Sequence, residues 1–400
     1  MRTMMAVFIC TILLFSLAKA ATLKIKMGGD LQKVIDLSNN NDTIIIAPGT
    51  YEADNNIFID SLCGNCQEHQ SPVEASFGFI IADKSLVIIG NSRDKTTLIT
   101  NAGYGLFIVN SPGTSISNLT ITGGIRDKDG NATDAAIVVR NSTVKIFRLN
   151  IIDNNNRADS VVVGIGGIFG REGSEIIISE CDIIGNGWDG VALYRGATAV
   201  IKDCLIKDGR GVGIGVTWDA TCIAYRNIVT GYWKGIGAFG TSWLAARNNA
   251  VFDNLGWGMI ATGKAYMDIT NNVIHHNGNC GTAIWSAKCT GRITNNIITS
   301  NGWREQWVCP CVGVWNYGDW SKWDFSYNIV WNNVDGDYRD IWDQTNTNNN
   351  LSVDPGFYGE SIFILKENSL AVDAGHPEIS DPNGSRSDIG LTGGPQGRLK

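Results

Sequence analysis

The sequence has no long apolar run after its first twenty residues and no Ser/Pro/Gly-rich linker. A membrane-spanning helix needs about 18 or more apolar residues in succession, so we expect the mature protein to be soluble. Proline is scarce, with 8 residues in 400, and the absence of a linker predicts a single domain over residues 21–400. Positive charge is not in excess either: the formal net charge is −7, which argues against a nucleic-acid partner.

The N-terminus does carry the pattern of an export signal. Arg2 precedes an apolar run over Met4–Leu17, and the small-residue pattern Ala18–Ala20 follows it. A basic residue, an apolar segment of this length and an A-x-A site are typical of a cleaved signal peptide. We therefore expect residues 1–20 to be a signal peptide. The mature protein is expected to be secreted or periplasmic, and a monomer.

The ten cysteines include Cys10 in this segment, so an odd number remains after cleavage. Export permits disulfides, and an odd number leaves at least one thiol free or paired between chains. Two local pairs and two cysteines around one predicted strand are the candidates: Cys63 and Cys66, Cys309 and Cys311, Cys280 and Cys289. Zinc is the alternative, but no His-x3–5-His motif accompanies these pairs. Loop disulfides or inert thiols are the preferred interpretation.

A short phrase recurs along the chain from Ile176 onward, with a period of roughly 23 residues. It reads apolar-x-apolar-x-x-(Cys/Asn)-x-(Ile/Val), then a polar turn and a glycine. Its anchors are Cys181, Cys204, Asn227, Asn249, Asn272, Asn296 and Asn328. The residues three before and two after each anchor are apolar, as short half-buried strands require. A leucine-rich horseshoe or a propeller would need a different frame or period.

These phrases predict an all-β fold, a right-handed parallel β-helix. Adjacent coils of such a solenoid lie about 4.8 Å apart, so the anchor Asn side chains can pass hydrogen bonds from coil to coil. Solenoids need caps over their open cores. At the N-terminus we expect a short amphipathic helix over Leu31–Leu37 and a strand within Asp42–Tyr51. The segment from Asp373 to Asp388 is interpreted as the C-terminal cap.

With these motifs the chain resembles bacterial right-handed β-helix proteins of the pectate-lyase-like superfamily. The resemblance rests on the Asp42–Tyr51 entry, Leu86–Gly90, Lys95–Ile99, the Asn-(Val/Ile)-Ile coils, and the closing Asp-Ala-Gly and Asp-Ile-Gly. It implies the fold over nearly all of the mature chain. Members include lyases, hydrolases, epimerases, tailspikes and proteins without known chemistry, so it does not imply one activity. No Asp-Asp pair with Gly-His-Gly, no Asp-Pro-His-Asp and no Trp-Ile-Asp-His is present.

Stacking the coils gives candidate catalytic residues instead. Glycines 190, 211 and 235 each open a strand, and Asp189, Arg210 and Lys234 precede them. One column of a carboxylate and two cations could bind an acidic sugar and abstract the proton alpha to its carboxylate. In this interpretation Arg210 neutralises the sugar carboxylate, and Lys234 or Arg210 with a lowered pKa is the base. The alternative is a solvated salt-bridge ladder.

Aromatic residues predict a sugar-binding surface on the same side. Tyr194, Phe239 and Trp285 share one repeat phase beside a column of mostly small residues, and Trp218, Trp233 and Trp243 occupy flanking turns. Flat aromatic rings stack on the apolar faces of sugars. The competing interpretation is that these rings cover loops or cap the core.

Two weaker candidates complete the sequence-based picture. His276 is expected in register with Asp208 and Asp253, where it could be a general base or an ordinary exposed residue. The oxygens of Asp381, Asn383 and Ser385, with Asp388, have the spacing of a calcium loop, although an Asx turn explains them equally well. Ca²⁺ is therefore the one cofactor to consider.

The sequence as a whole predicts a carbohydrate-active protein that binds a polysaccharide. If it is an enzyme, we expect a polysaccharide lyase acting on uronic-acid polymers, with a glycoside hydrolase as the other enzymatic option. The rival from another class is a non-catalytic glycan-binding or envelope and matrix protein.

Overall fold

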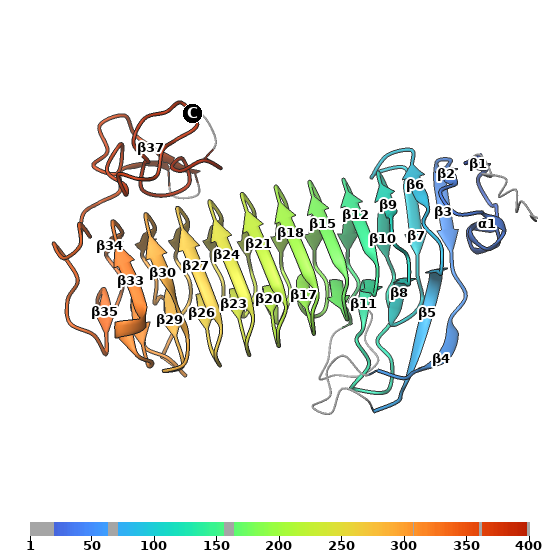
Figure 1. Ribbon diagram of the computed structural model, residues 1–400, viewed down its shortest axis with the longest axis horizontal. Helices are drawn as coiled ribbons and strands as arrows, with labels where there is room; N and C mark the ends of the chain where they lie inside the picture. The colour runs from blue at the N-terminus through green and yellow to red at the C-terminus, as the bar shows by residue number, and fades with distance from the viewer. Residues whose placement is uncertain (1–19, 63–70, 156–163, 307, 360–361, 398–400) are drawn as a thin grey trace, which may run out of the picture.

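The computed structural model describes residues 20–62, 71–155, 164–306, 308–359 and 362–397. Most of the predicted signal peptide, together with Cys63 and Cys66, lies outside these ranges. Three long parallel sheets wind into an elongated solenoid (Figure 1), which confirms the right-handed parallel β-helix. Among the described residues, no helix is long and apolar enough to cross a membrane.

From β6 onward, each coil contributes one strand to each of the three sheets. Sheet A contains β1 (Thr22–Ile25), β2 (Thr43–Ile46), β6 (Val87–Gly90), β9 (Thr114–Ser117), β12 (Thr143–Phe147), β15 (Glu175–Ser179), β18 (Thr198–Lys202), β21 (Thr221–Tyr225), β24 (Trp243–Arg247), β27 (Tyr266–Thr270), β30 (Thr290–Thr294) and β33 (Trp323–Ser326). Sheet B contains β3 (Gly49–Glu52), β7 (Thr96–Ile99), β10 (Thr120–Thr122), β13 (Asn150–Ile152), β16 (Asp182–Ile184), β19 (Leu205–Lys207), β22 (Ile228–Thr230), β25 (Ala250–Phe252), β28 (Val273–His275), β31 (Ile297–Thr299) and β34 (Ile329–Trp331).

Sheet C carries the candidate site. It contains β4 (Asn56–Asp60), β5 (Val73–Ala82), β8 (Tyr104–Val109), β11 (Ala135–Arg140), β14 (Gly166–Arg171), β17 (Val191–Leu193), β20 (Val212–Val216), β23 (Lys234–Ala238), β26 (Trp257–Ala261), β29 (Thr282–Ile284), β32 (Val314–Asn316) and β35 (Tyr338–Arg339). Its β4–β5 pair is antiparallel. Outside the three sheets lie helix α1 (Leu31–Leu37), the 3-10 turn η1 (Trp320–Lys322) and the antiparallel pair β36 (Phe357–Gly359) and β37 (Ile362–Leu365).

The predicted N-terminal helix is confirmed as α1. Its N-cap Asp30 accepts a hydrogen bond from the Lys33 amide at 2.9 Å, which pairs one of the amides that a helix start leaves open. Leu31 and Ile35 on one face are buried in the main core, so α1 packs its apolar stripe onto the first coils.

The predicted asparagine ladder is also confirmed, and its hydrogen bonds repeat in the same order from coil to coil. The side-chain oxygen of Asn272 accepts from the amide and the Nδ2 of Asn249, at 2.9 and 3.0 Å. Its own Nδ2 donates to Asn296 at 3.0 Å and to the carbonyl of Ala246 at 2.8 Å. The same pattern joins Asn227, Asn249, Asn272, Asn296, Asn328 and Asn350. Each Asn thereby satisfies backbone groups buried at the bend.

A second ladder of asparagines follows the opposite bend, where sheet B leads into sheet C. Its members are Asn154 and Asn186, then Asn254, Asn277, Asn301 and Asn333. Tyr232 interrupts it: its amide donates to Asn254, and its ring lies where a Cβ on Gly209 would be. The Tyr232 hydroxyl is buried beside Gly190 and has no hydrogen-bond partner among the described residues.

Replacing Tyr232 by Phe should therefore stabilise the protein. The change removes a buried hydroxyl that makes no hydrogen bond, a group that costs about 1–2 kcal/mol. We expect a higher Tm by thermal denaturation. The control is Tyr104→Phe, since the Tyr104 hydroxyl is bonded to Asp60 at 3.0 Å and to the Thr133 amide at 3.2 Å. That variant should lose stability, and a Tyr232→Phe protein that melts lower than wild type would contradict the prediction.

The segment interpreted as a C-terminal cap packs on the flank of the solenoid (Figure 1). A cluster of Phe363, Leu365, Ala371 and Ile389 covers outward residues of sheet B. Asn271 Nδ2 donates to the carbonyl of Asp388 at 2.9 Å, and Asn248 Nδ2 donates to that of Leu391 at 2.9 Å. Asn248 and Asn271, at equivalent turns of successive coils, thus bind the C-terminal segment to the solenoid.

Candidate functional site

The outer face of sheet C presents one column of side chains at the start of its strands. In register these are Asp189, Val212, Lys234, Trp257 and Cys280. Arg210 does not belong to this column: it lies two residues before Val212 with its side chain exposed, so the predicted Asp189–Arg210–Lys234 alignment is wrong for Arg210. Asp189 and Lys234 are therefore two coils apart, about 10 Å between backbones.

A close contact explains why the sequence suggested the wrong register for the coil that contains Gly211. The Asp189 carboxylate accepts a hydrogen bond from the Val212 amide at 2.7 Å. A Cβ on Gly211 would come within 1.8 Å of the same carboxylate oxygen. Gly211 is thus a glycine because Asp189 needs the space, whereas the repeat glycine of that coil is Gly213, in register with Gly235.

The two charged groups of the column have pKa values displaced toward neutrality. Burial raises the pKa of Asp189 to about 6, although the Val212 amide and the charge of Lys234 favour its ionised form. Burial lowers the pKa of Lys234, opposed by the charge of Asp189. The Lys234 Nζ lies 5.3 Å from the ring centre of Trp257. A carboxyl and an amine with displaced pKa values on one face of a sheet have the properties of acid–base groups.

Aromatic rings continue from Lys234 toward the C-terminal end of sheet C. We call this series the aromatic row: Trp233, Trp257, Trp285, Trp315 and Tyr317. Successive ring centres are 5.8, 5.4, 5.2 and 5.6 Å apart. Tyr317 is 66% exposed, while Trp257 and Trp315 pack on the sheet beneath. Trp233 and Trp285 were predicted binding residues; Trp315 and Tyr317 were missed because the longer coil before them hides their repeat phase.

Tyr194 and Phe239 share the repeat phase of Trp285, as predicted, because all three directly follow in-register ends of sheet C strands. Tyr194 is 8% exposed and packs edge-on against Phe169, so it contributes to a cluster rather than a free platform. Phe239 is half-buried, and its ring covers Gly237. Trp243 is on sheet A, where it stacks on Tyr266 at 6.0 Å, and it therefore does not share a face with the others.

A groove of ≈1020 Å³ follows the turns by which the chain leaves sheet C. Its lining includes Arg140, Glu172, Arg195, Trp218, Asp219 and Lys264. The guanidinium of Arg195 lies 4.1 Å from the Trp218 ring centre, and the Gly196 amide donates to Asp219 at 2.8 Å. A Cβ on Gly196 would meet nothing closer than 3.7 Å, so the groove is open there to a ligand. The predicted Trp218 thus belongs to this groove.

A buried ion network forms one end of the groove. Arg171 is fully buried and pairs with Asp60 at 2.9 Å and Glu172 at 2.9 Å. Arg140 also contacts Asp60, at 2.7 Å. Removing one partner from such a desolvated network costs the protein several kcal/mol of stability, unlike the removal of one partner from a solvated ladder. The network therefore fixes Arg140 and Glu172 in the groove wall.

The N-terminal half of the outer face is covered by the loop before β11. Its Asp127 accepts hydrogen bonds from the amide and hydroxyl of Ser76, at 2.9 and 2.5 Å. Asp134 accepts from the Asp127 amide at 3.0 Å, and its other carboxylate oxygen is buried without a partner among the described residues. Burial, with the charge of Asp127 as the next cause, raises the pKa of Asp134 to about 8.

This pair should make the stability depend on pH. The folded state favours the protonated form of the Asp134 carboxyl. The contribution of this carboxyl to the free energy of unfolding is therefore complete below the ordinary pKa of an aspartate and is lost as the pH rises through about 8. We expect Tm to fall between pH 5 and pH 9, and Asp134→Asn to flatten this dependence because the amide stays neutral. Asp129→Asn, on the same loop, serves as the control. Equal slopes for Asp134→Asn and wild type would contradict the prediction.

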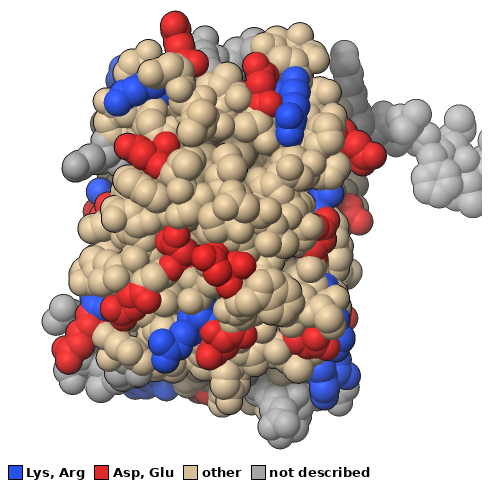
Figure 2. Space-filling model, turned by 90° about the vertical axis from the view of Figure 1, so that its left-hand side faces the viewer, with Lys and Arg blue, Asp and Glu red and all other residues tan. Residues whose placement is uncertain are grey.

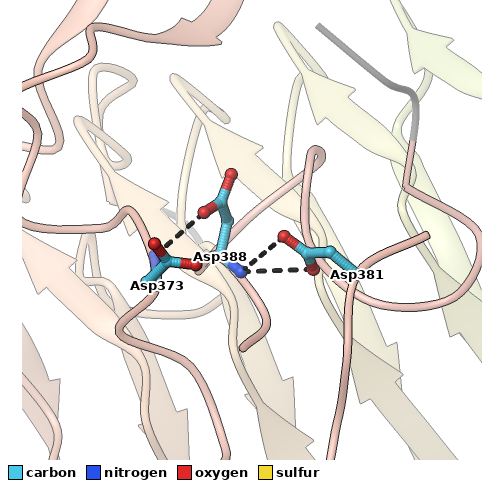
Figure 3. A group of neighbouring side chains, drawn as sticks. All are labelled: Asp373, Asp381 and Asp388. Atoms are coloured by element: carbon cyan, nitrogen blue, oxygen red, sulfur yellow. Dashed lines mark hydrogen bonds between the residues drawn. The ribbon is translucent and has the colours of Figure 1, made fainter. Parts of the chain in front are cut away.

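An acidic cluster lies in the C-terminal segment (Figure 3). Oxygens of Asp373, Asp381 and Asp388 are within 4.8 Å of one another. The Asp373 amide donates to Asp388 at 2.9 Å, and the Gly394 amide donates to Asp381 at 2.7 Å. Burial and the neighbouring carboxylates raise the pKa of Asp381. Asp381 and Asp388 are therefore together as predicted, with Asp373 as a third member. Asn383 instead accepts from Ser385, in the Asx-turn arrangement.

The remaining surfaces give weaker signals. His276 contacts Asp253 at 2.6 Å, but both side chains are about half exposed and lie beside sheet B, away from Lys234. Figure 2 looks onto the C-terminal end of the solenoid, where acidic side chains are spread over the face and basic ones are scattered between them and along the edges. The described part of this end therefore offers no continuous basic surface.

Comparisons with known proteins agree with this architecture. The family model described as "Right handed beta helix region" matches residues 36–229 and 166–334. Among solved structures, pectate lyase Pel9A is similar with a TM-score of 0.51 and 14% identity, over 94% of this chain and 97% of that one. The A-module of the Azotobacter vinelandii mannuronan C-5 epimerase AlgE6 has a TM-score of 0.44 and 14% identity, over 82% and 96%. No curated protein matches the sequence significantly.

Proposed function

Because this chain belongs to the right-handed β-helix family, we propose that it is an exported carbohydrate-active protein that binds a polysaccharide along sheet C. We further propose that it is a lyase that cleaves uronic-acid polymers by β-elimination. The observation that carries both steps is that the aromatic row, Lys234 and Asp189 share the outer face of sheet C, where the two charged groups have displaced pKa values.

The aromatic row supports binding of an extended glycan. Its rings lie along the solenoid axis, one per coil from Trp233 to Trp315 with Tyr317 on the same coil as Trp315, at centre-to-centre spacings of 5.2–5.8 Å. Pyranose rings can stack on the members of the row that reach the surface, Trp233, Trp285 and Tyr317, whereas Trp257 and Trp315 are buried at 3% and 7% exposure. Two guanidinium or ammonium groups lie beside the row: Lys234 near Trp257, and Arg304 at 5.0 Å from the Trp233 ring centre. This combination suits a sugar chain that bears carboxylates.

The proposed reaction assigns one task to each charged group. Arg304, in the task first given to Arg210, neutralises the uronate carboxylate and so acidifies the proton alpha to it. Neutral Lys234 takes that proton from C5, the C4–O bond breaks, and a C4=C5 double bond forms. Asp189 in its protonated form gives a proton to the departing glycosidic oxygen. The lowered pKa of Lys234 and the raised pKa of Asp189 favour these protonation states.

The test is an assay with polygalacturonate, polymannuronate, polyguluronate and neutral glucans. We expect absorbance at the unsaturated-uronate band to rise with at least one uronate polymer and with no neutral glucan. Binding without any such absorbance, for every polymer, would reject the lyase proposal. Absence of binding to all of them would reject the polysaccharide proposal as well.

A non-catalytic glycan-binding protein of the envelope or matrix is the second candidate. It is favoured by the contact of Lys234 with the Trp257 ring, because a cation–π contact stabilises the charged ammonium, which is not a base. The Asp189 carboxylate also has a structural bond, to the Val212 amide. Under this alternative Lys234→Met weakens binding, and no polymer is cleaved.

Calcium is proposed as a stabilising ion at Asp373, Asp381 and Asp388. Three carboxylates in close contact repel one another, and a hard cation with oxygen ligands relieves that repulsion. We expect added Ca²⁺ to raise Tm as the ligand-binding relation requires, and Asp381→Asn to abolish the rise. Asp354→Asn, at an exposed carboxylate outside the cluster, is the control and should keep the rise. An equal rise in Asp381→Asn and wild type would exclude this cluster as the site.

A further inference from the structure

The insertion between β31 and β32 folds back over preceding coils of sheet C. The Arg304 amide donates to the Gly278 carbonyl at 2.8 Å, and the Arg304 guanidinium donates to the Leu255 carbonyl at 3.2 Å. Trp303 lies against His276 with ring centres 5.7 Å apart. The described part of this insertion, residues 300–306 and 308–313, thus crosses the beginning of the aromatic row.

Two cysteines meet under this insertion. Cys280 comes from the column that contains Asp189 and Lys234, and Cys309 comes from the insertion. Both thiols are buried, at 0% and 1% exposure, and their Sγ atoms are 3.5 Å apart. They share one cluster with Trp257 and Trp315. Side chains at this separation need only a small rotation to reach the length of about 2.05 Å of an S–S bond.

We propose that Cys280 and Cys309 form a disulfide that fastens this insertion over the aromatic row. Both thiols are oxidised by a disulfide reagent or oxidoreductase: each loses a proton, the two sulfurs bond, and the two sulfurs of the oxidant leave as thiols. The bond itself does not depend on the proposed function. Its effect on substrate does, because it would hold Arg304 beside Trp233 and Lys234.

Burial determines when the bond can form. The thiolate is the reactive form of cysteine, and burial raises the pKa of the Cys280 thiol. The exchange therefore takes place before the insertion has packed, during folding in an oxidising compartment, and the finished bond is protected from reductants. Cys311 is a poorer partner because its Sγ already lies 3.0 Å from the Arg304 carbonyl and 3.7 Å from the Asn279 amide group.

The direct test is peptide mapping of the full chain, refolded with a mixture of oxidised and reduced glutathione, then alkylated in denaturant without reduction. We expect a protease fragment that contains Cys280 linked to one that contains Cys309. Cys309→Ser should eliminate this fragment and lower Tm by several degrees relative to oxidised wild type. The matched control Cys289→Ser, also at a buried thiol, should keep the link.

Three results would overturn the proposal. These are complete alkylation of both Cys280 and Cys309, a link from Cys309 to Cys311, and a zinc ion that is recovered with the protein and released by a chelator. Because the readout is covalent, it is independent of any glycan assay. A lyase-inactive protein that contains the link would reject the proposed function and leave the disulfide standing.

Discussion

Replacing Lys234 by Met should lower the turnover of uronate polymer by about 100- to 10,000-fold, the usual contribution of a general base. Methionine keeps an apolar side chain against Trp257, so the aromatic row and the KM should change little. Loss of kcat with KM preserved is the signature of a group needed only in the transition state. The measurement is the initial rate of absorbance at the unsaturated-uronate band.

The pH profile separates this role from simple charge loss. Activity requires neutral Lys234 and protonated Asp189, so the rate should be bell-shaped, with an optimum between pH 6 and the lowered pKa of Lys234. Lys288→Met, which removes an exposed lysine elsewhere on the solenoid, is the control and should match wild type. Undiminished turnover in Lys234→Met would contradict the assignment of the base.

Replacing Asn272 by Leu should destabilise the protein by about 3 kcal/mol or more. Leucine has a similar volume, but it leaves the Asn249 amide and the Ala246 carbonyl without these partners inside the solenoid, and it removes one of the two hydrogen bonds of the Asn249 Nδ2. Each buried group left unpaired costs about 1–3 kcal/mol. Denaturant unfolding monitored by circular dichroism would measure the loss.

The control for this change is Asn91→Leu, at an exposed turn. The Asn91 side chain is not part of either ladder, so its replacement should change stability by less than about 0.5 kcal/mol. Equal effects at Asn272 and Asn91 would mean that ladder bonds contribute nothing to stability, contrary to the geometry of the turn.

The sequence predicted the solenoid well because its signal is repeated in every coil. The spacing of Asn227 to Asn328 fixed the first ladder, and the cap at Leu31–Leu37 followed from its apolar stripe. The second ladder was missed because Tyr232 and Gly209 replace two of its asparagines, which breaks the pattern in sequence. A repeat shows clearly only where the same residue type recurs.

The candidate site was predicted in part. Lys234, Trp233 and Trp285 share the outer face of sheet C as expected, but Arg210 does not join their column. Gly211, which makes room for Asp189, resembles the repeat glycine in the sequence, whereas Gly213 has that position in the structure. Trp243 lies on sheet A instead. The role of Arg304 depends on an insertion that folds back across several coils, and no repeat phase reports such a contact. Register can be read from the chain only where the repeat is regular, and the course of an irregular loop depends on tertiary packing.

The most direct test of the central claim is the mass of the oligosaccharides released from a uronate polymer. Beta-elimination predicts fragments with an unsaturated non-reducing end, each lighter by one water molecule than the product of hydrolysis, and it predicts their loss with Lys234→Met. Saturated fragments from wild-type protein would identify a hydrolase and contradict the elimination mechanism. Intact polymer after binding to the aromatic row would contradict catalysis itself.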